Sequence, residues 1–325
     1  MTKAIRIHEA GGPDAMRWET VDVGTPGYGE VRVRHTAIGL NFIDVYHRSG
    51  LYPLPTFPAI IGLEGAGIVD ALGDGVSGLN LGQRVAYASP PPGAYCEARL
   101  MPADRLVKIP DTVPDEQAAA MMLQGMTAHY LLRRTYPVQP GETILIHAAA
   151  GGVGLLACQW AKHLGATVIG TVGTEEKAAL ARENGCDFPI LYTKENFTAR
   201  VREITDGAGV PVVYDSIGKD TFEGSLDCLR PLGMMVSFGN ASGPLPPFDA
   251  GILSAKGSLF FTRPTLMTYT AKPEDLQSAA KELFDMVERR HLKISVNQTY
   301  PLRDAAQAHT DLEGRKTTGS TVLIP

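Results

Sequence analysis

A glycine-rich turn between a strand pattern and a helix pattern constrains this chain more than any other feature. Residues 143–147, Thr-Ile-Leu-Ile-His, predict a buried strand, and residues 153–164 have the composition of a helix. The segment between them reads Ala-Ala-Gly-Gly-Val-Gly, which is G-x-G-x-x-G with alanine in place of the first glycine. Gly151 lets the backbone approach a pyrophosphate, and Gly154 lets the helix pack on the strand. Because a helix N-terminus adds amide donors and a positive potential, the turn predicts a dinucleotide-binding site.

The alternation of strand and helix patterns continues downstream of this turn. Further strands are expected at residues 166–171, 188–191, 210–215, 233–238 and 257–261, and helices at residues 175–184, 195–205 and 221–229. Such alternation predicts right-handed βαβ crossovers and a doubly wound parallel sheet. Pro211 is expected at the first residue of its strand or in an edge strand, because proline has no amide to donate to a sheet.

The regions on either side of this alternation have a different sequence pattern. Residues 1–125 contain short β-type runs separated by glycine and proline, with one short helix near residues 41–49, and predict a mostly β domain. A helix is expected at residues 115–134, and another at 274–290 followed by short strands. We therefore expect a discontinuous outer domain, residues 1–125 and 263–325, with a nucleotide-binding domain, residues 126–262, inserted between its parts.

The end of the second strand discriminates between NAD and NADP. NAD enzymes place an Asp or Glu there to hold the ribose hydroxyls, whereas residues 171–174 of this chain read Thr-Val-Gly-Thr. Lys177 follows one helical turn later, and its ammonium attracts a 2′-phosphate that a carboxylate would repel. Glu175 and Glu176 are interpreted as solvated acids at a helix start. The sequence therefore favours NADPH.

Composition restricts the classes of partner and compartment. The chain has 325 residues, of which 44% are apolar, enough for a large core. Its net charge is −5 without a basic tract, which argues against nucleic acid and anionic membrane as partners. Four cysteines form no CxxC pair, and neither a signal peptide nor a membrane span is expected. These observations predict a cytoplasmic enzyme with reduced thiols.

Several stretches of the chain carry a resemblance to a known family. They are residues 41–46 (Asn-Phe-Ile-Asp-Val-Tyr), 48–52 (Arg-Ser-Gly-Leu-Tyr), 147–154, 213–216, 236–240 and 262–264. Together they closely resemble the quinone oxidoreductases, relatives of zeta-crystallin within the medium-chain dehydrogenase/reductase superfamily. The likeness runs from Ile5 to Pro325. It implies a chaperonin-10-like outer domain, a Rossmann domain, NADPH as cofactor and a homodimer.

The chain departs from the zinc-dependent branch of that superfamily. Zinc alcohol dehydrogenases carry a cysteine near the position of Asn41 and Gly-His-Glu where this chain has Gly62, Leu63 and Glu64. Leu63 cannot ligate zinc, so the resemblance implies no metal. Alcohol oxidation relies on a Lewis acid to stabilise an alkoxide, whereas a quinone or enone delocalises the charge of reduction itself. We therefore expect NADPH-dependent reduction of quinones.

The resemblance also implies a set of site residues. Asn41 is expected near the transferred hydride, with Tyr46 and Tyr52 as quinone-ring or proton-delivery groups. The implied cofactor contacts are Asn41, Phe42, Tyr46, Tyr130, Gly151, Gly152, Val153, Gly173, Thr174, Lys177, Tyr192, Ile217, Phe238, Gly239, Asn240, Ser242, Thr262, Pro264, Leu266 and Arg315. Asp44 is interpreted as a helix cap, and Gln124 is given no role. Because no nucleophile–base pair is visible, the cofactor is expected to carry the chemistry.

Two other functions fit parts of the pattern. An NADPH-dependent alkenal or enone reductase would use the same scaffold and an equally flat conjugated acceptor. A role of a different class, as a crystallin-like structural protein or an RNA-binding protein, is known among relatives of zeta-crystallin, but no basic and aromatic stripe supports RNA binding. The expected homodimer would form through the nucleotide domain, where the apolar strand at residues 257–261 could pair at the sheet edge.

Overall fold

The computed structural model describes residues 1–325, which divide into two compact units. The first unit comprises Met1–Gln124, Thr270–Glu288 and Ile294–Pro325, and the second comprises Gly125–Tyr269 and Arg289–Lys293. The second unit thus includes residues 263–269, which the sequence placed in the outer domain. Tyr269 stacks on Tyr130 of the same unit, with 4.5 Å between ring centroids, and this contact holds the segment there.

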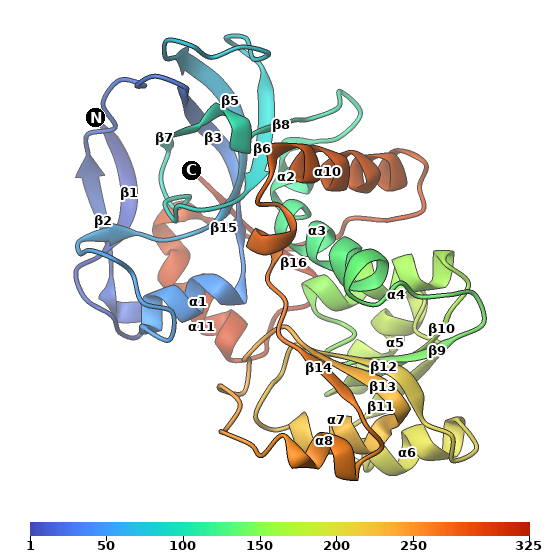
Figure 1. The fold of residues 1–325 in the computed structure, drawn as a ribbon. Helices are drawn as coiled ribbons and strands as arrows, with labels where there is room; N and C mark the ends of the chain where they lie inside the picture. Colours follow the sequence, from blue (N-terminus) through green and yellow to red (C-terminus); the bar gives the residue numbers. More distant parts are fainter. The chain divides into compact units, whose positions relative to one another are not determined.

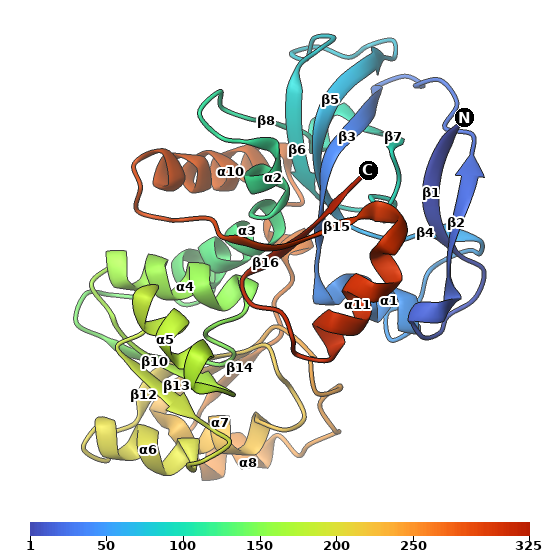
Figure 2. The ribbon, with the colours of Figure 1, turned by 180° about the vertical axis from the view of Figure 1, so that it is seen from behind.

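The first unit is built on two antiparallel-rich sheets (Figures 1 and 2). The larger has the order β15-β16-β3-β5-β6-β8, with β7 also paired to β3, and the smaller has the order β2-β1-β4. The strands are β1 (Thr2–Ile7), β2 (Met16–Val21), β3 (Glu30–Leu40), β4 (Ala59–Ile60), β5 (Glu64–Leu72), β6 (Arg84–Ala88), β7 (Ala98–Pro102), β8 (Val107–Lys108), β15 (Val296–Pro301) and β16 (Ser320–Ile324). Its helices are α1 (Phe42–Ser49), α2 (Asp115–Ala119), α10 (Pro273–Glu288) and α11 (Ala305–Glu313).

The period-two pattern of β3 explains how this unit forms its core. Val31 and Val33 are fully buried, whereas Arg32 and Arg34 between and after them lie toward the surface. Alternate residues of a strand point to opposite faces, so one face of β3 packs inward. Buried side chains from both sheets, including Tyr87, join the same cluster.

The second unit contains a six-stranded sheet in which every neighbouring pair is parallel, in the order β11-β10-β9-β12-β13-β14. The strands are β9 (Thr143–Ile146), β10 (Thr167–Val172), β11 (Phe188–Leu191), β12 (Val210–Asp215), β13 (Leu229–Ser237) and β14 (Phe260–Thr262). Its helices are α3 (Met122–Tyr130), α4 (Gly152–His163), α5 (Glu175–Glu183), α6 (Phe197–Ile204), α7 (Phe222–Cys228), α8 (Gly251–Ala255) and α9 (Leu266–Tyr269). Helices α4 and α5 cover one face of the sheet and α6 and α7 the other (Figures 1 and 2).

Several expectations about secondary structure need correction. Pro211 is not in an edge strand, because β12 lies between β9 and β13; the proline is tolerated beside a register irregularity between Val210 and Val212. The strand expected at residues 257–261 begins only at Phe260, since Gly257 and Ser258 have left-handed backbone angles. The segment after residue 290 was expected to contain short strands, but it also includes helix α11.

The helix expected at residues 115–134 is divided into α2 and α3, followed by a wider π-type turn over Leu131–Thr135. The break places a free helix start at α3, where the amide of Leu123 donates to the Glu64 carboxyl at 2.7 Å. The division of this segment therefore contributes directly to the site described below. No helix of the chain has both the length and the apolar composition of a membrane-spanning segment.

Candidate cofactor and active site

Most candidate cofactor residues of the second unit lie at one edge of its sheet. The carboxyl ends of parallel strands meet at the same edge, which is where ligands bind in doubly wound sheets. Each of the six strands is followed there by a candidate segment, beginning with the glycine turn after β9 and Gly173 after β10. Tyr192 directly follows β11, Ile217 follows β12, and residues 238–242 follow β13. Residues far apart in sequence are thus gathered at one edge.

The glycine turn after β9 has the geometry of a phosphate cradle. Gly151 is the N-cap of α4 in extended conformation, so the first helical amides, at Gly152 and Val153, have no acceptor within the helix. A Cβ on Gly154 would lie 2.2 Å from the carbonyl oxygen of Ala148, which only glycine avoids. The backbone therefore presents free amide donors at the positive end of a 12-residue helix, as a pyrophosphate requires.

The end of β10 carries no acidic side chain toward the edge. A Cβ on Gly173 would lie 2.9 Å from the Tyr192 hydroxyl, so this tyrosine lies over the glycine. Thr174 caps α5 by accepting a hydrogen bond from the Lys177 amide at 3.3 Å. Lys194 lies on the same side, where its ammonium pairs with Glu175 at 2.8 Å. The end of β10 is therefore bordered by the hydroxyls of Thr174 and Tyr192 and by the Lys194–Glu175 ion pair.

Asp215 fixes the loop that follows β12. It is fully buried, and one of its oxygens accepts hydrogen bonds from the Ile217 amide at 2.7 Å and the Gly218 amide at 3.1 Å. The other oxygen accepts from Thr221 and Ser225. All four bonds hold backbone or neighbouring side chains, so Asp215 supports the shape of the loop around Ile217.

The segments after β13 and β14 are joined by Arg263, which donates to the Gly239 carbonyl at 3.2 Å. A Cβ on Gly239 would lie 2.3 Å from the Ser216 carbonyl oxygen, so the two strand ends approach as closely as glycine allows. Ser242 donates to the Ile217 carbonyl at 3.0 Å. The structure therefore brings Phe238, Asn240 and Ser242 together with Ile217, while Thr262, Pro264 and Leu266 follow at the end of β14. Tyr130 is buried against Tyr269 in the same unit.

In the first unit, the aromatic residues predicted for the site lie on helix α1 or just after it. Phe42 and Tyr46 lie one turn apart, with ring centroids separated by 6.3 Å, and Tyr46 meets Tyr52 edge-on at 5.2 Å. The Tyr52 amide also donates to the Tyr46 carbonyl at 3.0 Å. Tyr46 is buried and Tyr52 half-buried. The two rings therefore pack directly against each other.

Asn41 is the N-cap of α1 and belongs to a buried polar network from four separate segments. Its side-chain amide donates to Glu64 at 2.6 Å, and its side-chain oxygen accepts from Gln124 at 3.1 Å. Gln124 in turn accepts a hydrogen bond from Ser320 at 2.7 Å. These hydrogen bonds fix the orientation of both side-chain amides, because the Glu64 carboxyl oxygen accepts a hydrogen bond and therefore faces the NH2 group of Asn41. The network therefore fixes which side-chain atom Asn41 presents to its surroundings.

The two carboxyl groups near Asn41 are both fully buried. Burial raises the pKa of Glu64 to about 8, although hydrogen bonds from Asn41 and the Leu123 amide oppose the shift. Burial likewise raises the pKa of Asp44 to about 7, opposed by hydrogen bonds from the Asn41 amide and the Tyr95 hydroxyl. Burial therefore favours the neutral, protonated form of both carboxyl groups, which lie at the N-terminus of α1.

The structure thus adds residues that sequence reasoning missed. Glu64 stood beside Leu63 in the sequence, but only Leu63 was interpreted; Gln124 was given no role and Ser320 was not noticed. Asp44 is a cap, as interpreted: its carboxyl accepts from the Asn41 amide at 2.9 Å. No local pattern predicts that these segments meet, because their contacts span up to 196 positions in the chain.

Arg315 lies in the first unit, after α11, with a left-handed backbone angle of +57°. Leu63 is buried, and no group of three or more His, Cys, Asp or Glu side chains is placed to hold a metal ion.

Two family models match the chain. One, described as an alcohol dehydrogenase GroES-like domain, matches residues 27–111, and the other, described as a zinc-binding dehydrogenase, matches residues 152–285. The chain is 56% identical over 325 residues to the quinone oxidoreductase of Pseudomonas aeruginosa, covering 100% of both chains. It is 51% identical over 334 residues to a 2-haloacrylate reductase of a Burkholderia species, covering 100% of this chain and 99% of the relative.

The fold is similar to that of a solved structure, the quinone oxidoreductase of Escherichia coli complexed with NADPH. The TM-score is 0.98 at 49% identity, covering 99% of this chain and 100% of the other. A GroES-like domain with a Rossmann domain and a glycine turn at its sheet edge defines the medium-chain dehydrogenase/reductase superfamily. Within it, the chain belongs to the quinone oxidoreductase family. The predicted family and fold class are confirmed.

Proposed function

We propose that this chain reduces quinones with NADPH, and that the residues at the second unit's sheet edge select this cofactor. The single observation that carries the choice of cofactor is the end of β10, where Gly173 lies under the Tyr192 hydroxyl in place of an acid. A carboxylate there would repel a 2′-phosphate, whereas the hydroxyl of Thr174 and the cation of Lys177 attract it. Membership in a family of quinone oxidoreductases supports the same function.

The residues of the glycine turn fit the rest of the dinucleotide. The amides of Gly152 and Val153 would hold the pyrophosphate, and Gly154 keeps α4 close enough to β9 for them to do so. Ile217, Gly239 and residues near the end of β14 would then contact the remaining part of the cofactor. When bound, the nicotinamide supplies a hydride to the acceptor. The chain itself supplies orientation and a proton.

Asn41, Tyr46 and Tyr52 would act at the nicotinamide end. The network from Glu64 fixes the amide of Asn41, so that its position does not change when substrate enters. Tyr46 and Tyr52, whose rings meet edge-on, present aromatic surface that suits a flat quinone ring. A quinone that accepts a hydride becomes a hydroquinone anion, and a phenol hydroxyl at hydrogen-bond distance can donate the proton it needs.

Oxidation of NADPH, measured across a panel of quinones and enones with NADH alongside, tests this function. We expect turnover with at least one quinone, and a higher kcat/KM with NADPH than with NADH. No turnover with any quinone would overturn the proposal, and so would equal use of NADH.

A second candidate function is the reduction of an activated carbon–carbon double bond. The observation that favours it is the 51% identity to a 2-haloacrylate reductase over the full chain. Enones, haloacrylates and quinones are all electron-poor conjugated carbonyls, so one site geometry serves them. Turnover of an enone or a haloacrylate, but of no quinone in the same panel, would establish this function instead.

We also propose a cytoplasmic homodimer that does not bind nucleic acid. β14 is an edge strand, and Phe260 on it is 57% exposed, a surface that pairing with a second copy would cover. Four free, buried cysteines suit a reducing compartment. Light scattering at micromolar concentration should give the mass of a dimer for the unmodified chain and of a monomer for Phe260→Lys. A monomeric unmodified chain would contradict the proposal.

A further inference from the structure

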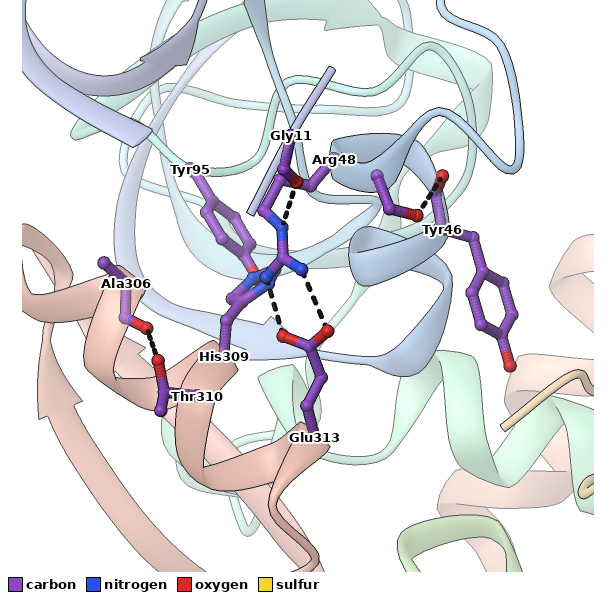
Figure 3. Close-up of polar contacts among 9 residues, drawn as sticks. Gly11, Tyr46, Arg48, Tyr95, Ala306, His309, Thr310 and Glu313 are labelled. Atoms are coloured by element: carbon purple, nitrogen blue, oxygen red, sulfur yellow. Dashed lines mark hydrogen bonds and ion pairs between the residues drawn. The ribbon is translucent and has the colours of Figure 1, made fainter. Parts of the chain in front are cut away.

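The first unit contains two buried arginines, and only one of them has a counter-ion. Arg48 is 2% exposed, and its guanidinium forms two hydrogen bonds of 2.9 Å with the Glu313 carboxylate (Figure 3). Arg99, on β7, is 7% exposed, and its hydrogen-bond partners are a tyrosine hydroxyl and a backbone carbonyl, neither of which carries a charge. Buried charges in proteins are normally paired, so the positive charge of Arg99 is uncompensated within the chain.

The hydrogen-bond donors of Arg99 are only partly used. Its Nη2 donates to the Pro91 carbonyl at 2.9 Å, and its Nη1 donates to the Tyr87 hydroxyl across a long 3.5 Å. The Nε is buried and has no hydrogen-bond partner. The guanidinium carbon lies 5.3 Å from the centroid of the Tyr87 ring, and this cation–π contact offsets only part of the cost of burying the charge. Because a guanidinium has five N–H groups, most of its donors meet no acceptor in the chain.

The groups next to Tyr87 are neutral as well. The Cys96 carbonyl can only accept, so the Nδ1 of His35, 2.7 Å away, carries a hydrogen and donates to it. Burial lowers the pKa of His35 to about 4, and the charge of Arg99 adds to this shift, so the ring is neutral. Its Nε2 therefore accepts from the Tyr87 hydroxyl at 2.7 Å. Burial also raises the pKa of Tyr87, which keeps this hydroxyl protonated. Neither side chain supplies a negative charge to Arg99.

Arg99 lines a pocket of about 610 Å³ that lies wholly within the first unit. This volume is in the range of small-molecule sites. The lining comes from β1, β2, β4, β7 and the loop that precedes β7. Part of the wall is apolar and is formed by Pro58, Ile60, Pro91 and Pro92. None of the residues that line this pocket is among those predicted for the cofactor or for catalysis.

Two further charged side chains line the pocket, and neither compensates Arg99. Arg6 forms an ion pair with Glu19 at 3.1 Å, so its charge is already balanced within the chain. Asp22 is exposed, and water screens its carboxylate more strongly than it screens the buried guanidinium. The unbalanced buried charge of the pocket is therefore that of Arg99, and it is positive.

We propose that this pocket is a binding site for a small organic carboxylate. The carboxylate accepts hydrogen bonds from the Nη groups of Arg99, because a guanidinium can donate two parallel bonds to the two oxygens of a carboxylate. The apolar body of the ligand lies against Ile60 and the prolines of the wall. A flat acid such as benzoate has both parts, whereas inorganic phosphate has only the charge. The site is an addition to quinone reduction, since the two share no residue.

Isothermal titration calorimetry with benzoate and with inorganic phosphate tests the proposal. The unmodified chain should bind about one benzoate with a Kd below about 1 mM, and phosphate at least about tenfold more weakly because it has no apolar body. Arg99→Met removes the charge but keeps a long, unbranched side chain. It should weaken benzoate binding at least about tenfold, because the charge-assisted hydrogen bonds are lost.

Two more variants separate the pocket from a general effect on the fold. Thr20→Trp places a large side chain at the pocket wall from an exposed position of β2, and it should block benzoate while Arg99 stays in place. Arg17→Met removes an exposed arginine of the same strand that does not line the pocket, and it should bind benzoate like the unmodified chain. Benzoate should raise the Tm of the unmodified chain and of Arg17→Met, but not that of the two pocket variants.

Three results would overturn the inference. One is the absence of binding by the unmodified chain at benzoate concentrations up to about 10 mM. Another is unchanged benzoate binding in Thr20→Trp or in Arg99→Met, and the first of these variants decides the question if the second does not fold. The third is phosphate binding as tight as that of benzoate, which would mean that the pocket takes an anion without an apolar body. Quinone turnover with NADPH should persist in all three variants, so the proposed function is tested independently of this site.

Discussion

The sheet edge of the second unit and the buried network around Asn41 in the first unit are both built from distant segments, but they are encoded differently. At the sheet edge, parallel strands place their ends together, and glycines such as Gly154 are required because a Cβ there would lie only 2.2 Å from a backbone oxygen. Around Asn41, the geometry comes from side chains whose meeting depends on tertiary packing. The first region follows from a repeating pattern, whereas the second becomes visible only in three dimensions.

If the sheet edge is encoded in its glycines, replacing one should have the largest effect. Gly154→Val should weaken NADPH binding by more than about a thousandfold, because the new side chain collides with the Ala148 carbonyl and forces the phosphate turn to move. Titration with NADPH measures this. Gly251→Ala is a suitable control, since its nearest neighbour is the flexible Asp249 side chain at 3.2 Å, and it should bind normally. Normal binding by Gly154→Val would show that the turn does not cradle the cofactor.

The network around Asn41 should respond to the loss of its carboxyl group. Glu64→Ala should lower the free energy of unfolding by about 2–4 kcal/mol, because the Asn41 side-chain amide and the Leu123 amide lose their buried acceptor. Chemical denaturation measures the change. Ser320→Ala should have a smaller effect, since Gln124 retains its bond to Asn41. An unchanged stability for Glu64→Ala would mean that water satisfies these donors and that the network does not fix Asn41.

Substitutions of Tyr46 and Tyr52 test whether a side chain of the first unit supplies the proton that the reduced quinone takes up. Tyr52→Phe should reduce kcat with a quinone by about a hundredfold, the lower range for loss of a general acid, while the Kd for NADPH stays within about twofold. Tyr52 is half-buried, so its hydroxyl can regain a proton from solvent, unlike the buried Tyr46. Tyr46→Phe should therefore have the smaller effect on kcat. Equal kcat values for the unmodified chain and both variants would assign the proton to water.

The least direct consequence of this network is a pH dependence specific to Glu64. Its pKa rises from 4.5 in the unfolded chain to about 8 in the native structure because it is buried. As pH rises from 4.5 to 8, the unfolded state loses this proton while the native state keeps it. The contribution to stability therefore falls, by at most about 1.4 kcal/mol per pH unit. The difference in unfolding free energy between the unmodified chain and Glu64→Gln should decline across this range. A constant difference would mean that Glu64 is ionised in the native state throughout.

Much of the fold could be predicted from the sequence because periodic patterns encode it. The βαβ alternation predicted the doubly wound sheet, and the glycine turn predicted the phosphate cradle at β9. Exceptions arose where local conformation or packing overrides a pattern. The apolar run at residues 257–261 is shortened by left-handed angles at Gly257 and Ser258, and the central position of Pro211 depends on a register irregularity.

The candidate site was less predictable in the first unit. Asn41 and Tyr46 were predicted as site residues from the family resemblance, but the side chains that hydrogen-bond to Asn41 were not predicted. Glu64, Gln124 and Ser320 are ordinary polar residues in the sequence, and only burial in a folded chain makes their hydrogen bonds necessary. The same holds for Arg48 and Glu313, which are separated by 265 positions. Polar networks of this kind have no local signature.

Selection of NADPH at the end of β10 is the central claim, and paired titration of NADPH and NADH tests it most directly. The unmodified chain should bind NADPH about ten- to a hundredfold more tightly than NADH, and Lys177→Ala should lose most of that preference by weakening NADPH alone. Arg182→Ala, on the exposed last turn of the same helix, should retain it. Equal or tighter binding of NADH by the unmodified chain, or an equal loss of both cofactors in Lys177→Ala, would contradict the account.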